Sequence, residues 1–215
     1  MRTGLILAAV SMLVLAPMAR ADWDIGDPYK MVNAPQLPNN SGQLWMGDNV
    51  LADDWECSGS GPVTDIHFWT FSEQILATVP VYVTISTNSP ATQARPYSLP
   101  DLQVWSRYFN PGQYTVRPWV VQGVQHQQIN IENIPDPFVQ TVGEIYWLGL
   151  RIQQEPPLAW NYSDTRFMDV AVQWDGTAWF PISDSDLAFV ITPEPATMCL
   201  LGIGAVGMYL RRRRK

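Results

Sequence analysis

The residues with the clearest potential for chemistry are acids in the first third of the chain. They are Asp48, Asp53, Asp54, Glu56 and Asp65. Carboxylate oxygens are the ligands that Ca²⁺ prefers, and we predict a structural Ca²⁺ held by some of Asp53, Asp54 and Asp65. The spacing matches no EF-hand loop. The alternative is therefore a solvated acidic loop in which Asp53 or Asp54 caps a turn.

Acids in pairs are also the catalytic groups of glycoside hydrolases. Alternation along residues 63–71 places Asp65 on one strand face with His67 and Trp69, but the sequence identifies no second acid. The chain has no G-x-S-x-G motif, and its only histidines, His67 and His126, lack a C-x-x-C partner for zinc. We therefore expect no enzymatic activity, and we interpret His67 as a hydrogen-bonded strand residue.

Aromatic residues offer a different chemistry, because Trp and Tyr on a surface can stack on sugar rings. Residues 156–164 are interpreted as a loop, and two further tryptophans flank a predicted hairpin. The candidates for glycan stacking are Trp160, Tyr162, Trp174 and Trp179. Aromatic residues also favour strand interiors, so burial in the core is the alternative for each of them.

The charge of the chain argues against nucleic acid as a partner. The chain has 13 basic and 20 acidic residues, a net of −7. Seven of the basic residues lie in residues 1–21 and 196–215, which contain no acid, so six basic residues remain against 20 acids and the rest of the chain carries −14. Phosphate binding needs a basic surface instead. All 10 Trp lie between these ends, which indicates a folded core.

Short β-rich runs separated by Pro, Gly, Asn and Asp fill the central region. The predicted strands are residues 63–71, 81–87, 102–109, 114–121, 127–131, 144–152, 166–174, 178–181 and 186–192. Turns are expected at residues 110–113 and at Asp175-Gly176, each closing a hairpin. Residues 33–42 and 88–100 are interpreted as polar loops. This pattern predicts an all-β fold, an antiparallel β-sandwich of jelly-roll-like form.

Both ends of the chain have features typical of targeting signals. Arg2, an apolar run at residues 5–15 and the A-x-A pattern of Ala19 and Ala21 predict a signal peptide over residues 1–21, cleaved before Asp22. At the other end, a short uncharged stretch follows a proline-rich motif and precedes a basic cluster. The motif is Pro193, Glu194 and Pro195, the stretch is residues 196–210, and the cluster is Arg211, Arg212, Arg213, Arg214 and Lys215.

The stretch of 15 residues is short for a membrane span and suits transient insertion, with the basic cluster on the cytoplasmic side. Residues 193–215 resemble the PEP-CTERM sorting signal of Gram-negative bacteria. The resemblance implies an exported substrate of an exosortase, a membrane protease-transpeptidase, in species that commonly make exopolysaccharide. The implied partners are signal peptidase and exosortase, and the implied location is the cell surface, the medium or, without processing, the membrane.

Residues 22–192 are expected to form one domain. Residues 51–57, 61–69, 144–150 and 186–191 (LADDWEC, GPVTDIHFW, EIYWLGL and DLAFVI) resemble a domain of unknown function in secreted PEP-CTERM proteins. That family implies no catalytic residues. We therefore expect a structural or adhesive component of the extracellular matrix. The alternatives are an exopolysaccharide-binding module and, less favoured, a glycan-active hydrolase.

Overall fold

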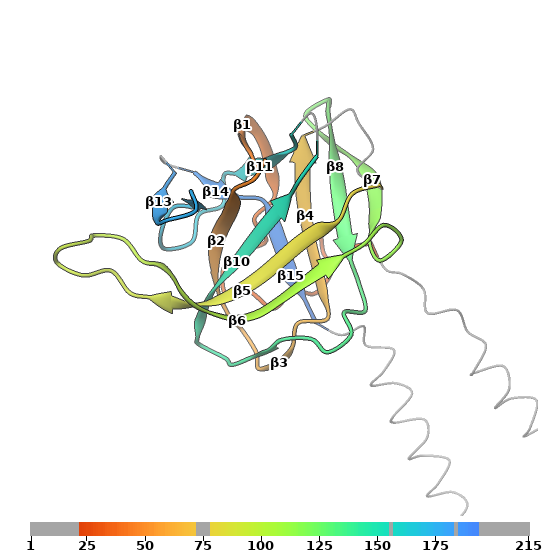
Figure 1. Ribbon diagram of the computed structural model, residues 1–215. Coiled ribbons are helices and arrows are strands. Elements are labelled where there is room, and N and C mark those ends of the chain that lie inside the picture. The colour runs from red at the N-terminus through yellow and green to blue at the C-terminus, as the bar shows by residue number, and fades with distance from the viewer. Residues whose placement is uncertain (1–21, 72–77, 155–156, 183–184, 194–215) are drawn as a thin grey trace, which may run out of the picture.

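The computed structural model describes residues 22–71, 78–154, 157–182 and 185–193, and this part of the chain is all-β and antiparallel (Figure 1). The strands are β1 (Pro38–Trp45), β2 (Val50–Glu56), β3 (Gly61–Pro62), β4 (Asp65–Phe71), β5 (Val81–Ser89), β6 (Leu99–Phe109), β7 (Thr115–Val121), β8 (Val124–Ile131), β9 (Val139–Gln140), β10 (Ile145–Ile152), β11 (Ala159–Ser163), β12 (Val172–Trp174), β13 (Trp179–Pro181), β14 (Asp186–Leu187) and β15 (Phe189–Thr192). The predicted fold class is confirmed.

Two sheets form a sandwich. The seven-stranded sheet has the order β1-β11-β4-β8-β7, with β14 paired to β11 and β15 paired to β4. The six-stranded sheet has the order β13-β12-β2-β10-β5-β6, and β3 pairs with β9 in a separate ribbon. Figure 1 shows β2, β10, β5 and β6 in front of β4, β8 and β15.

The side chains of β4 point alternately to the two faces of its sheet. Ile66 and Phe68 belong to the main core between the sheets, which also contains Trp55, Trp160 and Phe189. Trp69 points to the opposite face and packs with Trp23, Ala188 and Val190 in a second cluster. Because successive strand residues face opposite sides, the sequence pattern of residues 63–71 predicts this division correctly.

The hairpin predicted at Asp175-Gly176 is confirmed, since β12 and β13 pair across it and the Asp175 N–H donates to the Ala178 carbonyl at 3.2 Å. The hairpin predicted at residues 110–113 is wrong. That turn joins β6 of the six-stranded sheet to β7 of the other sheet. The hairpin partner of β7 is β8, across Gln122 and Gly123, which both have positive φ, as a tight turn with right-handed twist requires.

Three strands lie where the sequence analysis expected loops. β1 overlaps the polar run of residues 33–42, β2 contains the acidic run, and β11 lies within residues 156–164. All three are rich in polar residues, and the structure buries several of them, including Asp53, Asp54 and Asn161. Residue polarity therefore misled the prediction, because these side chains are buried in spite of it.

The last strand lies between β4 and the segment that follows the predicted cleavage site. Thr192 of β15 pairs with Asp65 of β4. On the other edge, the Lys30 N–H donates to the Ile191 carbonyl at 2.7 Å and the Gln36 N–H donates to the Phe189 carbonyl at 3.2 Å. The beginning and the end of the described chain therefore meet on β15.

Candidate functional site

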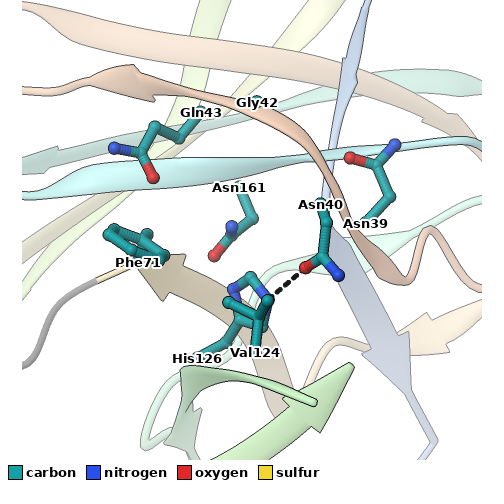
Figure 2. A pocket seen from close by; sticks show the side chains of 8 residues that line it. All are labelled: Asn39, Asn40, Gly42, Gln43, Phe71, Val124, His126 and Asn161. Atoms are coloured by element: carbon teal, nitrogen blue, oxygen red, sulfur yellow. Dashed lines mark hydrogen bonds between the residues drawn. The ribbon is translucent and has the colours of Figure 1, made fainter. Parts of the chain in front are cut away.

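A small pocket opens on the outer face of the seven-stranded sheet, at the end of β4. Its volume is about 130 Å³, below the range of drug-sized ligand sites. Figure 2 shows the side chains that line it, which come from β1, β4, β8 and β11: Asn39, Asn40, Gly42, Gln43, Phe71, Val124, His126 and Asn161. The lining therefore combines carboxamides, one imidazole and one aromatic ring, and it contains no carboxylate and no Lys or Arg.

The pocket contains two buried polar atoms without hydrogen-bond partners, Nδ1 of His126 and Oδ1 of Asn161. Both side chains are at least 98% buried. The other imidazole nitrogen, Nε2 of His126, lies 2.9 Å from Oδ1 of Asn40. Asn40 in turn donates through Nδ2 to the Val121 carbonyl at 3.1 Å, which fixes the orientation of its carboxamide.

This geometry determines which hydrogen-bonding groups a ligand of the pocket must have. Because Oδ1 of Asn40 only accepts, the proton of neutral His126 is on Nε2, and Nδ1 is an acceptor. Burial lowers the pKa of His126 and favours the neutral ring, although a side-chain hydrogen bond with Asn161 opposes this shift. The two unpartnered atoms are thus both acceptors. A ligand that satisfies them must supply hydroxyl or N–H donors.

The wall of the pocket that β1 supplies is held by local contacts. Oδ1 of Asn39 accepts hydrogen bonds from the backbone and hydroxyl of Ser41, and its Nδ2 donates to Asp164 at 2.6 Å. The register between β1 and β11 shifts between Pro38 and Gln43. Gly42 permits the close approach, because a Cβ atom there would lie 2.7 Å from the ring of Tyr162.

A second group of polar side chains is buried between the sheets and beside β2. Nε2 of Gln36 donates to both Asp53 and Asp186 at 3.2 Å, and Asp53 also accepts from the Leu187 N–H at 2.6 Å. Asp186 accepts from the Phe167 N–H at 2.7 Å. These bonds join β2 of one sheet to β14 of the other. The group is inaccessible to solvent, which argues for a structural role.

Burial changes the acidity of this group. It raises the pKa of Asp54 to about 9, with further contributions from the charges of Asp186 and Asp169. Burial likewise raises the pKa of Asp186 to about 6, against the Phe167 N–H and Gln36, which lower it. The pKa of Asp53 is raised well above its usual value by burial, then by Asp186 and Asp54. The three carboxyl groups therefore hold protons that exposed carboxylates would lose.

The structure does not bring together the three predicted Ca²⁺ ligands. Asp53 and Asp54 are neighbours on β2 and face opposite sides of it, while Asp65 begins β4 in the other sheet, where its Oδ1 accepts from the Asn133 N–H at 2.7 Å. In the described residues, no three His, Cys, Asp or Glu side chains form a group that would hold a metal ion. The alternative of a solvated acidic loop is wrong, because β2 is a buried strand.

The four predicted stacking residues have different surroundings. Trp160 is fully buried in β11, and its indole N–H donates to the Ala188 carbonyl at 2.8 Å, so its expected place in a surface loop is wrong. Tyr162 packs partly against the main core. Trp174 and Trp179 are partly exposed across the β12–β13 hairpin, with ring centroids 5.4 Å apart. Only this last pair is placed as the sequence analysis expected.

His67 is a hydrogen-bonded strand residue, as expected. Its Nδ1 lies 2.8 Å from Oδ1 of Asn130 and its Nε2 lies 3.4 Å from the Thr192 hydroxyl. Burial lowers its pKa to about 4, although the Asn130 bond opposes this. Cys57 is a buried free thiol, and burial raises its pKa to about 12.

Comparison with known families decides the identity of the domain. Residues 32–192 match a family described as a domain of unknown function, DUF7901. The chain belongs to the DUF7901 family. Residues 192–214 match the PEP-CTERM protein-sorting motif. No curated protein and no solved structure matches the chain.

The sorting motif follows directly from the DUF7901 domain and marks the chain as an exported, exosortase-sorted protein of the cell surface or the extracellular space. The predicted signal peptide with Ala19 and Ala21, and the tail from Glu194 to the Arg211–Lys215 cluster, lie outside the described residues. Among the residues that are described, no helix is long and apolar enough to cross a membrane.

The pocket of the DUF7901 domain is not predicted by the sequence. The sequence suggests His126 only as a possible metal ligand, and it indicates loops at Asn39, Asn40 and Asn161. The available signal was the density of Asn and Gln in residues 33–43, together with the N-Y-S run at Asn161. These residues meet only because β1 pairs with β11, more than 100 positions further along the chain.

Proposed function

We propose that this exported protein is a non-enzymatic surface component that binds neutral carbohydrate, such as a chain of exopolysaccharide, in the pocket. One observation carries the proposal: neither Nδ1 of His126 nor Oδ1 of Asn161, two buried atoms on neighbouring side chains, has a hydrogen-bond partner of ordinary geometry. Sugars present hydroxyl groups on adjacent carbons, so one sugar unit supplies the two donors that these atoms need.

The rest of the lining supports a sugar over other ligands with hydroxyl groups. The ring of Phe71 is 37% exposed and lies 5.9 Å from the ring of His126. An exposed aromatic face at the edge of a polar pocket suits the apolar face of a pyranose. The uncharged lining, in a protein region of net charge −14, favours a neutral glycan over an acidic one, which the acidic surface would repel.

The expected adhesive role follows from such binding, because a surface protein that holds a glycan attaches the cell to its matrix. A catalytic role has less support. The carboxyl groups with raised pKa, Asp53 and Asp54, are fully buried, and no pair of acids faces the pocket. Reducing-sugar release from a bound polysaccharide would contradict the non-enzymatic part of the proposal.

Binding is tested by titrating the purified protein with neutral monosaccharides and with exopolysaccharide from a PEP-CTERM-bearing species, using calorimetry and amide NMR. We expect shifts confined to residues 39–43, 71, 126 and 161. Phe71→Ala should weaken binding about 10-fold, since a lost stacking contact is worth about 1.4 kcal/mol.

The matched control is Phe180→Ala, which removes a 50% exposed phenylalanine from β13 of the other sheet and should leave the affinity unchanged. Phe71→Tyr should restore binding. If no neutral sugar perturbs the pocket residues, or if both Phe variants weaken binding equally, the proposal is wrong.

A further inference from the structure

The pocket is one end of a longer row of polar and aromatic residues on the outer face of the seven-stranded sheet. Strand register places Trp69 opposite Gln128, and Gln128 opposite Arg117. In the next position along these strands, Trp119 lies opposite His126 of the pocket. Because alternate residues share a face, Phe71 and His126 continue directly into Trp69, Trp119 and Gln128.

The first residues after the predicted cleavage site cover this continuation. The Trp23 ring lies 5.9 Å from that of Trp69 and 6.5 Å from that of Trp119, centroid to centroid. Its carbonyl accepts hydrogen bonds from Arg117 and, at 2.9 Å, from Nε2 of Gln128. These contacts involve the kinds of groups that line the pocket: an aromatic face and a carboxamide.

The fit beneath Trp23 is incomplete. The indole N–H groups of Trp23 and Trp69 are both buried and have no hydrogen-bond partner. An unsatisfied buried donor costs free energy, and a hydroxyl oxygen above Trp69 would satisfy it. The surface under Trp23 therefore has an unmet requirement for an acceptor, next to a pocket with an unmet requirement for donors.

Trp23 is also the only buried residue in its stretch. Residues 24–29 are exposed, and the ion pairs of Arg117 with Asp22 and Asp24 involve carboxylate side chains that are 40% and 65% exposed. Exposed ion pairs contribute little to stability. The Trp23 ring, the two hydrogen bonds to its carbonyl and a bond from Nδ2 of Asn130 to Asp22 at 2.8 Å thus fix this segment to the sheet.

We propose that the glycan-binding surface extends from the pocket over Trp69 and Gln128, and that Trp23 occupies this extension until a longer neutral glycan displaces it. The inference rests on the proposed function and specifies its ligand: a chain of several sugar units, one in the pocket and the next on the indole of Trp69.

The decisive comparison uses one neutral sugar as a monomer and as an oligomer of about six units, with the full chain and its Trp23→Ala variant. Removing Trp23 frees the extension, so the oligomer should bind about 10-fold more tightly to the variant, and the monomer should bind equally to both. Phe180→Ala, which removes an exposed aromatic ring from the other sheet, should change neither affinity.

A second measurement leaves Trp23 in place, in case the variant folds poorly. A spin label at Ile25→Cys, which is 72% exposed, in a Cys199→Ser background should gain mobility when the oligomer is added and stay unchanged with the monomer. If the monomer binds but the oligomer neither frees the label nor gains from Trp23→Ala, the extension is wrong and the pocket stands. If neither sugar binds, both proposals fall.

Discussion

At the scale of single residues, two neighbours on β2 show how differently buried acids are accommodated. Asp53 accepts hydrogen bonds from Gln36, from the Leu187 N–H and from the Asp54 N–H. Neither carboxylate oxygen of Asp54 has a partner of ordinary hydrogen-bond geometry. An unpartnered buried carboxylate is costly as an anion, which is why burial dominates the upward shift in the pKa of Asp54.

This shift predicts that the protein loses stability as the pH rises from 7 to 9. The pKa of Asp54 is about 9 in the folded protein and 3.8 when the group is exposed. The folded state therefore holds this proton more tightly than the unfolded state, and the resulting stabilisation is complete below pH 3.8 and is lost progressively as the pH rises to 9. The loss is about 1.4 kcal/mol per pH unit, which amounts to roughly 2–3 kcal/mol between pH 7 and 9, so Tm should fall by roughly 5–11 °C. Thermal denaturation followed by circular dichroism measures it.

The variant Asp54→Asn should remove most of that slope, because the amide does not ionise. Asp101→Asn, which changes an exposed acid of β6, should retain it. Below pH 6.5 His67 acts in the opposite direction: its lowered pKa, about 4, removes stability as the pH falls from 6.5 to 4, while the contribution of Asp54 still increases. Equal slopes in the wild type and Asp54→Asn would contradict the assignment.

Trp160 belongs to the core, so its replacement should affect folding. Trp160→Ala removes a fully buried ring that packs against Phe68 and Phe189. We expect a loss of about 3–5 kcal/mol in the free energy of unfolding, measured by urea denaturation. Trp45→Ala, on the strand that pairs with β11, removes a ring that is 54% exposed and should cost less than about 1 kcal/mol.

At the scale of elements, the close contact of β1 with β11 controls the shape of the pocket. Gly42→Ala would place a methyl group 2.7 Å from the Tyr162 ring, so the ring or the strand that carries it must shift. We expect a destabilisation of about 1–3 kcal/mol and weaker sugar binding. Gly59→Ala is the control, since no atom lies within 4 Å of a Cβ at that position. Unchanged sugar binding by Gly42→Ala would show that β1 does not shape the site.

The sequence predicts those elements whose apolar residues alternate and whose turns are local. β4, β5, β10 and the β12–β13 hairpin were predicted for these reasons. The sequence does not predict strand β2, because the burial of Asp53 depends on hydrogen bonds with Gln36 and Leu187, which are distant in sequence. The turn at residues 110–113 was misassigned because a local signal does not reveal whether the next strand joins the same sheet.

The pocket was harder to predict than the fold. Most of its residues are ordinary Asn, Gln and Phe side chains. What indicates a binding site is that atoms of His126 and Asn161 lack hydrogen-bond partners of ordinary geometry. Whether a polar atom has a partner is a property of the folded arrangement. The sorting motif needed no such information, because Pro193-Glu194-Pro195 is a contiguous signal that a processing enzyme recognises in the chain itself.

At the scale of the whole molecule, processing at both ends is directly measurable. Intact-mass spectrometry of protein from the cell surface and the medium should give a chain that starts at Asp22 and ends near Pro193–Ala196. A mass that still includes Arg211–Lys215 would mean that the tail is a lasting anchor. A chain retaining residues 1–21 would contradict the predicted signal peptide.

The position of β15 has a consequence for how the domain is presented. The sorting motif begins at Thr192, which pairs with Asp65 at one end of β4, and the pocket lies beside Phe71 at the other end. Six residue steps along an antiparallel strand span about 20 Å. The length of β4 therefore separates the proposed sugar site from the residue at which the sorting motif begins, and we expect the site to stay accessible to polymer while an exosortase processes the motif.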